Sequence, residues 1–196
     1  MILVLGGIAP VSTLQEIIRA CQHGSTEAFE QLVRQYQQYA FKIAYGILGS
    51  DRDAEDTVQE AFIAVYHQIK SLRNEEAFPT WLGKIVTNLC FRKVQNSGKR
   101  PTVPLDSIED LRISNTGPEE AYLALELKQD VHNALLNLPL DYRVVVVLRD
   151  IQGYSYSEIA DIAGIPLGTV KSRIHQARTL LADLLQPTRN EEEGER

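Results

Sequence analysis

The stretch that decides the fold is Tyr154–Ile174, which reads YSYSEIADIAGIPLGTVKSRI. Ser155 and Glu158 have the S-x-x-E spacing of a capping box, so a helix is predicted to begin there. Gly164 can take the left-handed conformation of a sharp turn, and Pro166 suits the first turn of a following helix. A short helix, a tight turn and a second helix are the layout of a helix-turn-helix, whose second helix enters the major groove of DNA.

The second helix of this pair is predicted to have a core face and a DNA face, taking about 100° per residue. The predicted core face consists of Leu167, Val170, Ile174, Ala177, Leu181 and Leu184. Short polar groups lie opposite, with cations on the flanks, which suits base edges in a groove and phosphates on either side. The predicted DNA contacts are Thr169, Lys171, Ser172, Arg173, Gln176 and Arg178. The alternative is a solvated helix with a few charges.

Outward from this motif, helical periodicity dominates the chain and strand alternation is nearly absent, so the predicted class is all-α. The β-branched run Val144–Val147 is predicted to be a buried helix, because helical signals flank it. Helices are predicted at 13–22, 26–48, 51–70, 76–96, 119–137, 140–150, 156–163 and 167–185.

Residues 97–118 break this periodicity with serines, glycines and prolines, and they are predicted to be a flexible linker. The linker separates a helical domain at 13–96 from a second at 119–185, which contains the helix-turn-helix. Residues 1–12 are predicted to be a disordered lead, because they are too short to span a membrane and lack the basic stretch of a secretory signal. Residues 186–196 are predicted to be a frayed acidic tail.

The net charge of −6 argues at first against a nucleic-acid binder. Residues 1–96 carry −1, the linker 0, and residues 119–196 carry −5. Two stretches nevertheless contain cations and no acid, namely 77–105 and 166–180. Because salt limits the reach of a charge to about 8–10 Å, a net negative chain can still present cationic faces to phosphate.

The sequence offers little for catalysis. Cys21 and Cys90 lie far apart inside apolar patterns and are predicted to be buried thiols. No C-x-x-C pair, Gly-rich phosphate loop or set of nucleophile and base is present. The sequence therefore predicts no enzyme, no cofactor and no metal site.

The helix predicted at 51–70 has an acidic face opposite its apolar stripe. Asp53, Asp56 and Glu60 lie on that face, with Gln59 and the apolar Ile63 beside them. Such a face is often simply solvated, and paired carboxylates can also serve catalysis or a metal. The third interpretation is a docking surface for a basic partner, with Ile63 as its apolar anchor.

The helix predicted at 76–96 combines the only tryptophan with several cations. Trp81, Leu82, Ile85 and Leu89 have helical spacing and are predicted mostly to be core. Lys84 and Asn88 are the more plausible contacts, because an asparagine can read a base edge and a lysine can meet phosphate. Arg92 and Lys93 extend the predicted DNA surface.

The combination resembles the small sigma factors of bacterial RNA polymerase, the extracytoplasmic-function group. Asp53–Phe62 is similar to a motif of sigma region two, and Phe78–Asn88 to the part that melts and reads the −10 element. Leu138–Arg143, Gly153–Ala160 and Gly168–Arg173 look like region four, which reads the −35 element. In that family an Asp and an Arg often follow the Asn at four and seven residues, where this chain has Arg92 and Gln95.

The resemblance implies a promoter-specificity subunit in the cytoplasm. The residues that match Asp56, Gln59 and Glu60 contact the β′ clamp helices of core RNA polymerase in that family, and region four also meets the β flap. It further implies promoter DNA and an anti-sigma factor as partners. The alternative is a stand-alone regulator that binds DNA as a homodimer, which leaves the acidic helix unexplained.

Overall fold

The computed structural model describes residues 13–97 and 118–186, which contain eight α-helices and three single helical turns but no strand. The helices are α1 (Leu14–Gln22), α2 (Thr26–Leu48), α3 (Asp51–Gln68), α4 (Phe78–Ser97), α5 (Pro118–Asn137), α6 (Leu140–Val146), α7 (Tyr156–Ala163) and α8 (Leu167–Leu185). The turns are η1 (Ile69–Ser71), η2 (Glu75–Ala77) and η3 (Val147–Ile151). The all-α prediction is confirmed.

The predicted helices differ from the observed ones mainly at their ends. The helix predicted at 51–70 ends at Gln68 and continues as η1, and the helix predicted at 140–150 becomes a π-helical turn, η3, after Val146. The run Val144–Val147 is helical and buried, as predicted. The predicted lead, nearly all of the linker and the tail lie outside the described residues.

The N-terminal unit, α1 to α4, is built around α2. The side chains of Thr13, Ser25 and Ser50 cap the first three helices, because each accepts a hydrogen bond from a free backbone N–H. Gly49 ends α2 at φ 72°, a left-handed conformation that lets the chain turn back into α3. Helix α2 packs against α1, α3 and α4, and both cysteines are buried in this unit, as predicted.

The C-terminal unit, α5 to α8, places α6 beneath the helix-turn-helix. Helix α8 packs along α6, α7 and α5, and Val170, Ile174 and Ala177 are its buried residues. The prediction that Leu167 and Leu184 belong to the core is wrong, since they are 45% and 47% exposed. The reason is the difference in helix length. Helix α8 has 19 residues and is about 28 Å long, whereas α6 has only 7 residues, so both ends of α8 extend past α6.

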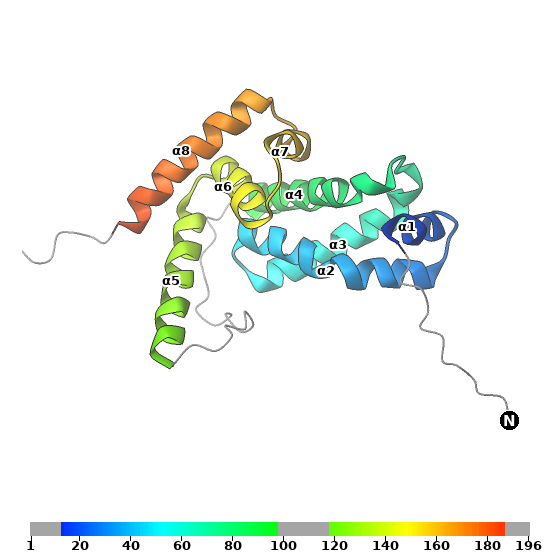
Figure 1. Ribbon diagram of the computed structural model, residues 1–196, viewed down its shortest axis with the longest axis horizontal. Coiled ribbons are helices and arrows are strands. Elements are labelled where there is room, and N and C mark those ends of the chain that lie inside the picture. The colour runs from blue at the N-terminus through cyan, green and yellow to red at the C-terminus, as the bar shows by residue number, and fades with distance from the viewer. Residues whose placement is uncertain (1–12, 98–117, 187–196) are drawn as a thin grey trace, which may run out of the picture.

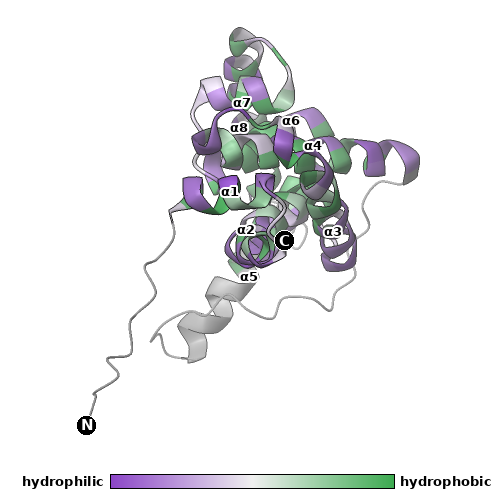
Figure 2. Ribbon diagram, turned by 90° about the vertical axis from the view of Figure 1, so that its right-hand side faces the viewer, coloured by the Kyte–Doolittle hydropathy of each residue, from purple (hydrophilic) through white to green (hydrophobic). Residues whose placement is uncertain are grey.

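The two units pack against each other. Helix α7 lies on α4, and α5, α6 and η3 contact α2, so α6 and α7 stand between α8 and the N-terminal unit (Figure 1). One buried cluster contains residues from both, including Ile47 of α2 and Ile162 of α7. Hydrophobic and hydrophilic residues alternate along the helices (Figure 2), as this packing requires.

Candidate nucleic-acid and partner interfaces

The predicted docking residues lie together on the outer face of α3. Asp56, Gln59, Glu60 and Ile63 are all exposed, and Ile63 is 60% exposed despite its apolar side chain. The opposite face carries buried Ala54, Ala61, Phe62 and Val65. The acidic face therefore follows from the amphipathic pattern of the helix, and an exposed isoleucine among carboxylates suits contact with a basic and partly apolar partner.

Lys93 of α4 is joined to this acidic face. Its Nζ lies 3.0 Å from Asp53 Oδ1 and 3.5 Å from Asp56 Oδ2, and it also donates to the Asp53 carbonyl oxygen at 3.2 Å. Sequence reasoning grouped Lys93 with the DNA contacts and missed this link. No local signal could have found it, because the partners are 40 residues apart in sequence.

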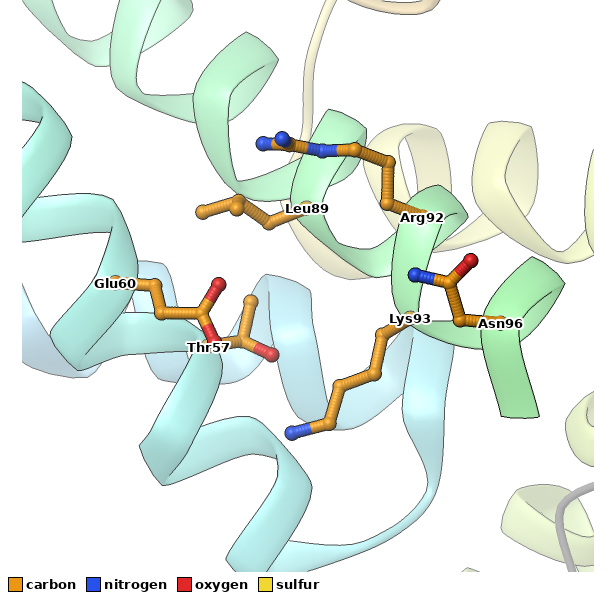
Figure 3. Close-up of a pocket in the computed structure, with 6 residues that line it drawn as sticks. All are labelled: Thr57, Glu60, Leu89, Arg92, Lys93 and Asn96. Carbon is orange, nitrogen blue, oxygen red and sulfur yellow. The ribbon is translucent and has the colours of Figure 1, made fainter.

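A cleft of about 420 Å³ opens on the surface where α3 and α4 pack together (Figure 3). Thr57 and Glu60 line it from α3; Leu89, Arg92, Lys93 and Asn96 line it from α4. Lys93 reaches across toward α3, whereas Arg92 extends alongside α4 (Figure 3). The cleft places the acidic docking face next to the cationic face of α4.

The exposed surface of α4 is a narrow strip. Lys84, Asn88 and Arg92 are exposed and follow one another at four-residue spacing, so they lie in one row along the helix. Neither Lys84 nor Arg92 forms an ion pair with another residue of 13–97 or 118–186. Both cations are therefore available to an anionic partner.

The other predicted residues of this helix belong to the core or its edge. Leu82 and Leu89 are buried, and Trp81 and Ile85 are half-buried. The ring of Trp81 packs at a tilt against Phe78, 6.1 Å between centroids. Leu82 and Leu89 are core, as predicted, whereas Trp81 and Ile85 are only partly buried against the core.

The helix-turn-helix has the predicted caps. The Ser155 side chain accepts from the Glu158 N–H, which caps the helix. The Glu158 carboxylate accepts from the Ser155 hydroxyl and from the Ser155 N–H, and these two bonds lower the pKa of Glu158. Gly164 ends α7 at φ 66°, and Pro166 directly precedes α8. The two helices therefore meet at a sharp turn, with Val170 buried between them.

The predicted DNA face of α8 is solvent-accessible, but two of its cations are tied to acids. Lys171, Ser172, Gln176 and Arg178 are exposed, and Thr169 and Arg173 are half-buried.

Arg173 pairs with Asp141 at 2.7 Å. Arg178 pairs with Asp150 through two nitrogens, which raises the pKa of that guanidinium. The phenol of Tyr142 donates to Gln176 Oε1 at 2.9 Å. Sequence reasoning missed these three partners on α6 and η3, because only helix packing brings them to α8.

Apolar side chains are also exposed where α5 and α8 extend beyond the rest of the unit. They are Leu127, Val131, Leu180, Leu184 and Leu185. Helices α5 and α8 contact each other, so these residues lie on neighbouring helices. An exposed apolar set of this kind is typical of a protein-contact surface.

Within residues 13–97 and 118–186, no three His, Cys, Asp or Glu side chains are grouped so that they could hold a metal ion. The same residues include no helix long and apolar enough to cross a membrane.

Comparison with known proteins matches two parts of the chain to family models. Residues 32–100 match the family "Sigma-70 region 2", and residues 128–181 match "Sigma-70, region 4". The first match covers α3 and α4, and the second covers the helix-turn-helix.

Several curated relatives align along nearly the whole chain. The extracytoplasmic-function (ECF) RNA polymerase sigma-E factors of Haemophilus influenzae and Escherichia coli are each 37% identical, over 89% of this chain and 96% and 95% of their own lengths. The ECF RNA polymerase sigma factor SigW of Bacillus subtilis is 34% identical over 88% of this chain and 97% of its own.

Two solved structures share the fold. CnrH, determined in complex with the cytosolic domain of CnrY, is 26% identical with a TM-score of 0.63, over 86% of this chain and 94% of that one. The sigma factor RpoE of Bartonella quintana, in complex with the anti-sigma factor NepR, is 26% identical with a TM-score of 0.62, over 84% of this chain and 100% of that one. The chain belongs to the sigma-70 family of RNA polymerase sigma factors, in its extracytoplasmic-function group.

Proposed function

We propose that this sigma factor docks on core RNA polymerase through α3 and contacts promoter DNA through α4 and α8. The observation that carries the proposal is the distribution of charge: an acidic face on α3, a row on α4 with two cations unpaired among the described residues, and on α8 a polar face flanked by cations, two of which are paired with Asp141 and Asp150. An acidic face repels phosphate, so it suits a protein partner, whereas the two cationic helices suit DNA.

The polymerase contact is assigned to Asp53, Asp56, Gln59, Glu60 and Ile63. The carboxylates would meet the basic residues of the β′ clamp helices, and Ile63 would supply buried apolar area at the centre of the contact. Lys93 holds Asp53 and Asp56 on one side of α3, which reduces the freedom of both carboxylates before docking.

The −10 element is assigned to Lys84, Asn88 and Arg92, with Lys93 at the border of the docking face. Lysine and arginine in one row can follow the phosphates of a strand, and Asn88 between them can read a base edge. Arg92 replaces the aspartate that is usual in the family, so this helix carries an added positive charge where its relatives often carry a negative one.

The −35 element is assigned to α8, with Thr169, Lys171, Ser172, Arg173, Gln176 and Arg178 toward the major groove. Asp141, Asp150 and Tyr142 orient three of these side chains before DNA arrives, which favours sequence reading over non-specific attraction. The exposed apolar residues of α5 and α8 favour contact with the β flap.

The remaining proposals concern an anti-sigma partner and the cellular location of the chain. The solved relatives in complex with NepR or CnrY support an inhibitory anti-sigma partner for this chain as well. Initiation chemistry belongs to the core enzyme, so the proposal gives this chain no catalytic site of its own and places it in the cytoplasm.

The test is reconstitution with core RNA polymerase. Asp56→Ala and Glu60→Ala are expected to weaken holoenzyme assembly by roughly tenfold or more, because each removes a carboxylate at the centre of the interface. Glu30→Ala removes an exposed carboxylate from α2 and is the matched control. In-vitro transcription should fall in parallel with assembly for the two α3 variants and remain for the control.

The competing function, a homodimeric regulator, makes the opposite forecast. A chain that elutes as a stable dimer and ignores core polymerase in size-exclusion chromatography would contradict the proposal.

A further inference from the structure

The side-chain amide of Gln176 on α8 is held by the phenol of Tyr142 on α6. The Tyr142 hydroxyl donates to Gln176 Oε1 at 2.9 Å, across 34 residues of sequence. Gln176 is exposed and lies in one row of α8 with Ser172, four residues before it. This row belongs to the proposed DNA face, so the direction of the amide decides which hydrogen bonds the helix offers there.

The phenol that holds the amide is itself fixed in place. Tyr142 lies in the first turn of α6, where its N–H donates to the Pro139 carbonyl oxygen at 3.0 Å. The preceding residue, Asp141, pairs with Arg173 at 2.7 Å, so two consecutive residues of α6 hold two residues of α8 that are three positions apart. The Tyr142 ring packs against the small buried cluster of Leu135, Leu138, Val146 and Ala177. The hydroxyl is therefore presented from a rigid position.

The direction of this hydrogen bond sets the direction of the amide. A glutamine amide has two N–H donors on Nε2 and only acceptor lone pairs on Oε1, and the two atoms diverge from the same carbon. Helix α6 packs along α8 (Figure 1), so an oxygen turned toward Tyr142 leaves the nitrogen turned away from α6, toward the solvent side of α8. Gln176 therefore presents N–H donors to a groove that α8 enters.

Donors at this position favour some bases over others. In the major groove guanine and thymine carry a carbonyl oxygen, O6 or O4, where adenine and cytosine carry an amino group, N6 or N4. An N–H donor bonds to the carbonyl, but against an amino group both donors lose their partners, which costs binding energy. A glutamine that is free to turn can instead bond to adenine through both of its polar atoms. Fixing the amide thus changes which bases it recognises.

We propose that Tyr142 is a positioning residue that makes Gln176 a hydrogen-bond donor, so that α8 selects guanine or thymine over adenine and cytosine on the strand that Gln176 faces in the −35 element. The selection of bases rests on the proposed function, whereas the orientation of the amide stands on the contact with Tyr142 alone. Part of the base specificity is then set by α6, which precedes the helix-turn-helix.

The test is selection of promoters by reconstituted holoenzyme from a pool randomised through the −35 element. The base pair that faces Gln176 is the one whose preference disappears in Gln176→Ala. Wild type should accept both G·C and T·A there in one orientation, because both place a carbonyl on the same strand. It should reject the two reversed pairs by about three- to tenfold, the worth of one hydrogen bond. Selection of a single pair as adenine would overturn the proposal.

Tyr142→Phe removes only the hydroxyl and keeps the ring against its cluster. The amide can then turn over, so discrimination against adenine should be lost while the pairs accepted by wild type still bind. If Tyr142 merely stiffened α8, this variant would weaken binding to all promoters alike and leave the base preference unchanged, which would overturn the proposal.

Tyr156→Phe is the matched control for Tyr142→Phe. It makes the same change on α7 and retains the ring beneath Arg149, 5.1 Å from the guanidinium carbon to the centroid. The Tyr156 hydroxyl forms no hydrogen bond with any other residue in 13–97 or 118–186. Its base preference is expected to equal that of wild type.

Gln176→Glu provides a second, independent variant. Glutamate has the same shape as glutamine but an ionised carboxylate only accepts hydrogen bonds, so the preference should invert to adenine and cytosine on that strand. Retention of the guanine and thymine preference would show that this side chain does not read the base.

A measurement on the free chain separates this inference from the proposed function. The NMR signals of the Gln176 side-chain amide are identified by their loss in Gln176→Ala, and their protons should show no strong nuclear Overhauser effect to the Tyr142 ring. A strong effect would mean that the nitrogen faces the phenol, and would overturn the inference even if the holoenzyme selects promoters. A holoenzyme that does not assemble, or that selects no −35 sequence, contradicts the proposed function and with it the reading of bases by Gln176.

Discussion

Helices α4 and α8 each carry one DNA-facing surface in the proposed function, but the first is fixed by apolar packing and the second partly by charge. Helix α4 buries Phe78, Leu82, Val86, Leu89 and Cys90. Helix α8 buries Val170, Ile174 and Ala177, and it gains the pairs of Arg173 with Asp141 and Arg178 with Asp150. The free surface of α4 is correspondingly narrow, whereas most of α8 is accessible.

This difference indicates different tasks. A helix locked in an apolar core presents its row of side chains rigidly, which suits holding an opened strand. A helix whose cations are already paired attracts phosphate less, and it exchanges those partners for DNA at a cost. The acids around α8 are therefore expected to restrain DNA binding by the C-terminal unit alone.

The difference between α4, held by apolar packing, and α8, held partly by ion pairs, should be clearest when one leucine in each helix is truncated. Leu82→Ala in α4 removes a fully buried side chain and is expected to lower the free energy of unfolding by about 3 kcal/mol. Leu184→Ala in α8, at a 47% exposed position, is expected to cost less than about 0.5 kcal/mol. Denaturant unfolding measures both, and similar losses would contradict the difference in packing.

Arg143 is a buried charged residue of α6, and its replacement should have the next largest effect on stability. It is 4% exposed, donates to the carbonyl oxygens of Ile47, Leu136 and Leu138, and burial lowers its pKa to about 10. Arg143→Met leaves three carbonyl oxygens without this donor and is expected to lower stability by roughly 2–3 kcal/mol.

Arg52→Met, at an exposed position of α3, is the control for Arg143→Met and should change stability by less than about 0.5 kcal/mol. Thermal unfolding of the two variants side by side decides the point. An unaltered melting temperature for Arg143→Met would show that the buried guanidinium is not structural.

The expected restraint of DNA binding by acidic residues can be tested on the ion pair of Arg173 with Asp141. Arg173→Ala should weaken binding of holoenzyme to promoters that depend on the −35 element by about tenfold, since it removes a cation from the groove. Asp141→Asn should instead strengthen non-specific binding of DNA by the free chain, with the gain fading as salt rises. A drop in DNA affinity for Asp141→Asn would mean that the acid only positions the arginine.

The stability effect of the same pair should be small. Asp141 is half-exposed, so a double-mutant cycle with Arg173 is expected to give a coupling of no more than about 1 kcal/mol.

The smallest expected effect is the pH dependence of the contact between the units. Burial lowers the pKa of His132 from its ordinary 6.5, against weaker opposing effects of the Gly49 backbone and Asp51, while Arg143 lowers it further. The unfolded chain therefore binds this proton more readily, so stability contributed by neutral His132 is present above pH 6.5 and declines as pH falls below it.

His132→Gln should flatten the melting temperature between pH 7 and 5 relative to wild type, and His175→Gln, at an exposed site of α8, should not. A wild-type profile with no slope attributable to His132 would contradict the assignment.

The features of the fold that depend on local sequence patterns could be predicted from the sequence. Eight helices, the capping box at Ser155, the left-handed turn at Gly164 and the exposed row on α4 all follow from periodicity and cap chemistry. The core assignment of Leu184 failed because periodicity does not reveal where the partner helix ends. The links of Lys93 to Asp53 and of Arg143 to Ile47 could not be predicted, because they join residues 40 and 96 positions apart.

The most direct test of the account is the affinity for promoter DNA, measured with and without core RNA polymerase at physiological salt. Specific, tight binding is expected only for the holoenzyme, because the free chain is net negative, has its α8 arginines paired, and holds its two units together. Tight and sequence-specific binding of a whole promoter by the isolated chain would contradict the account.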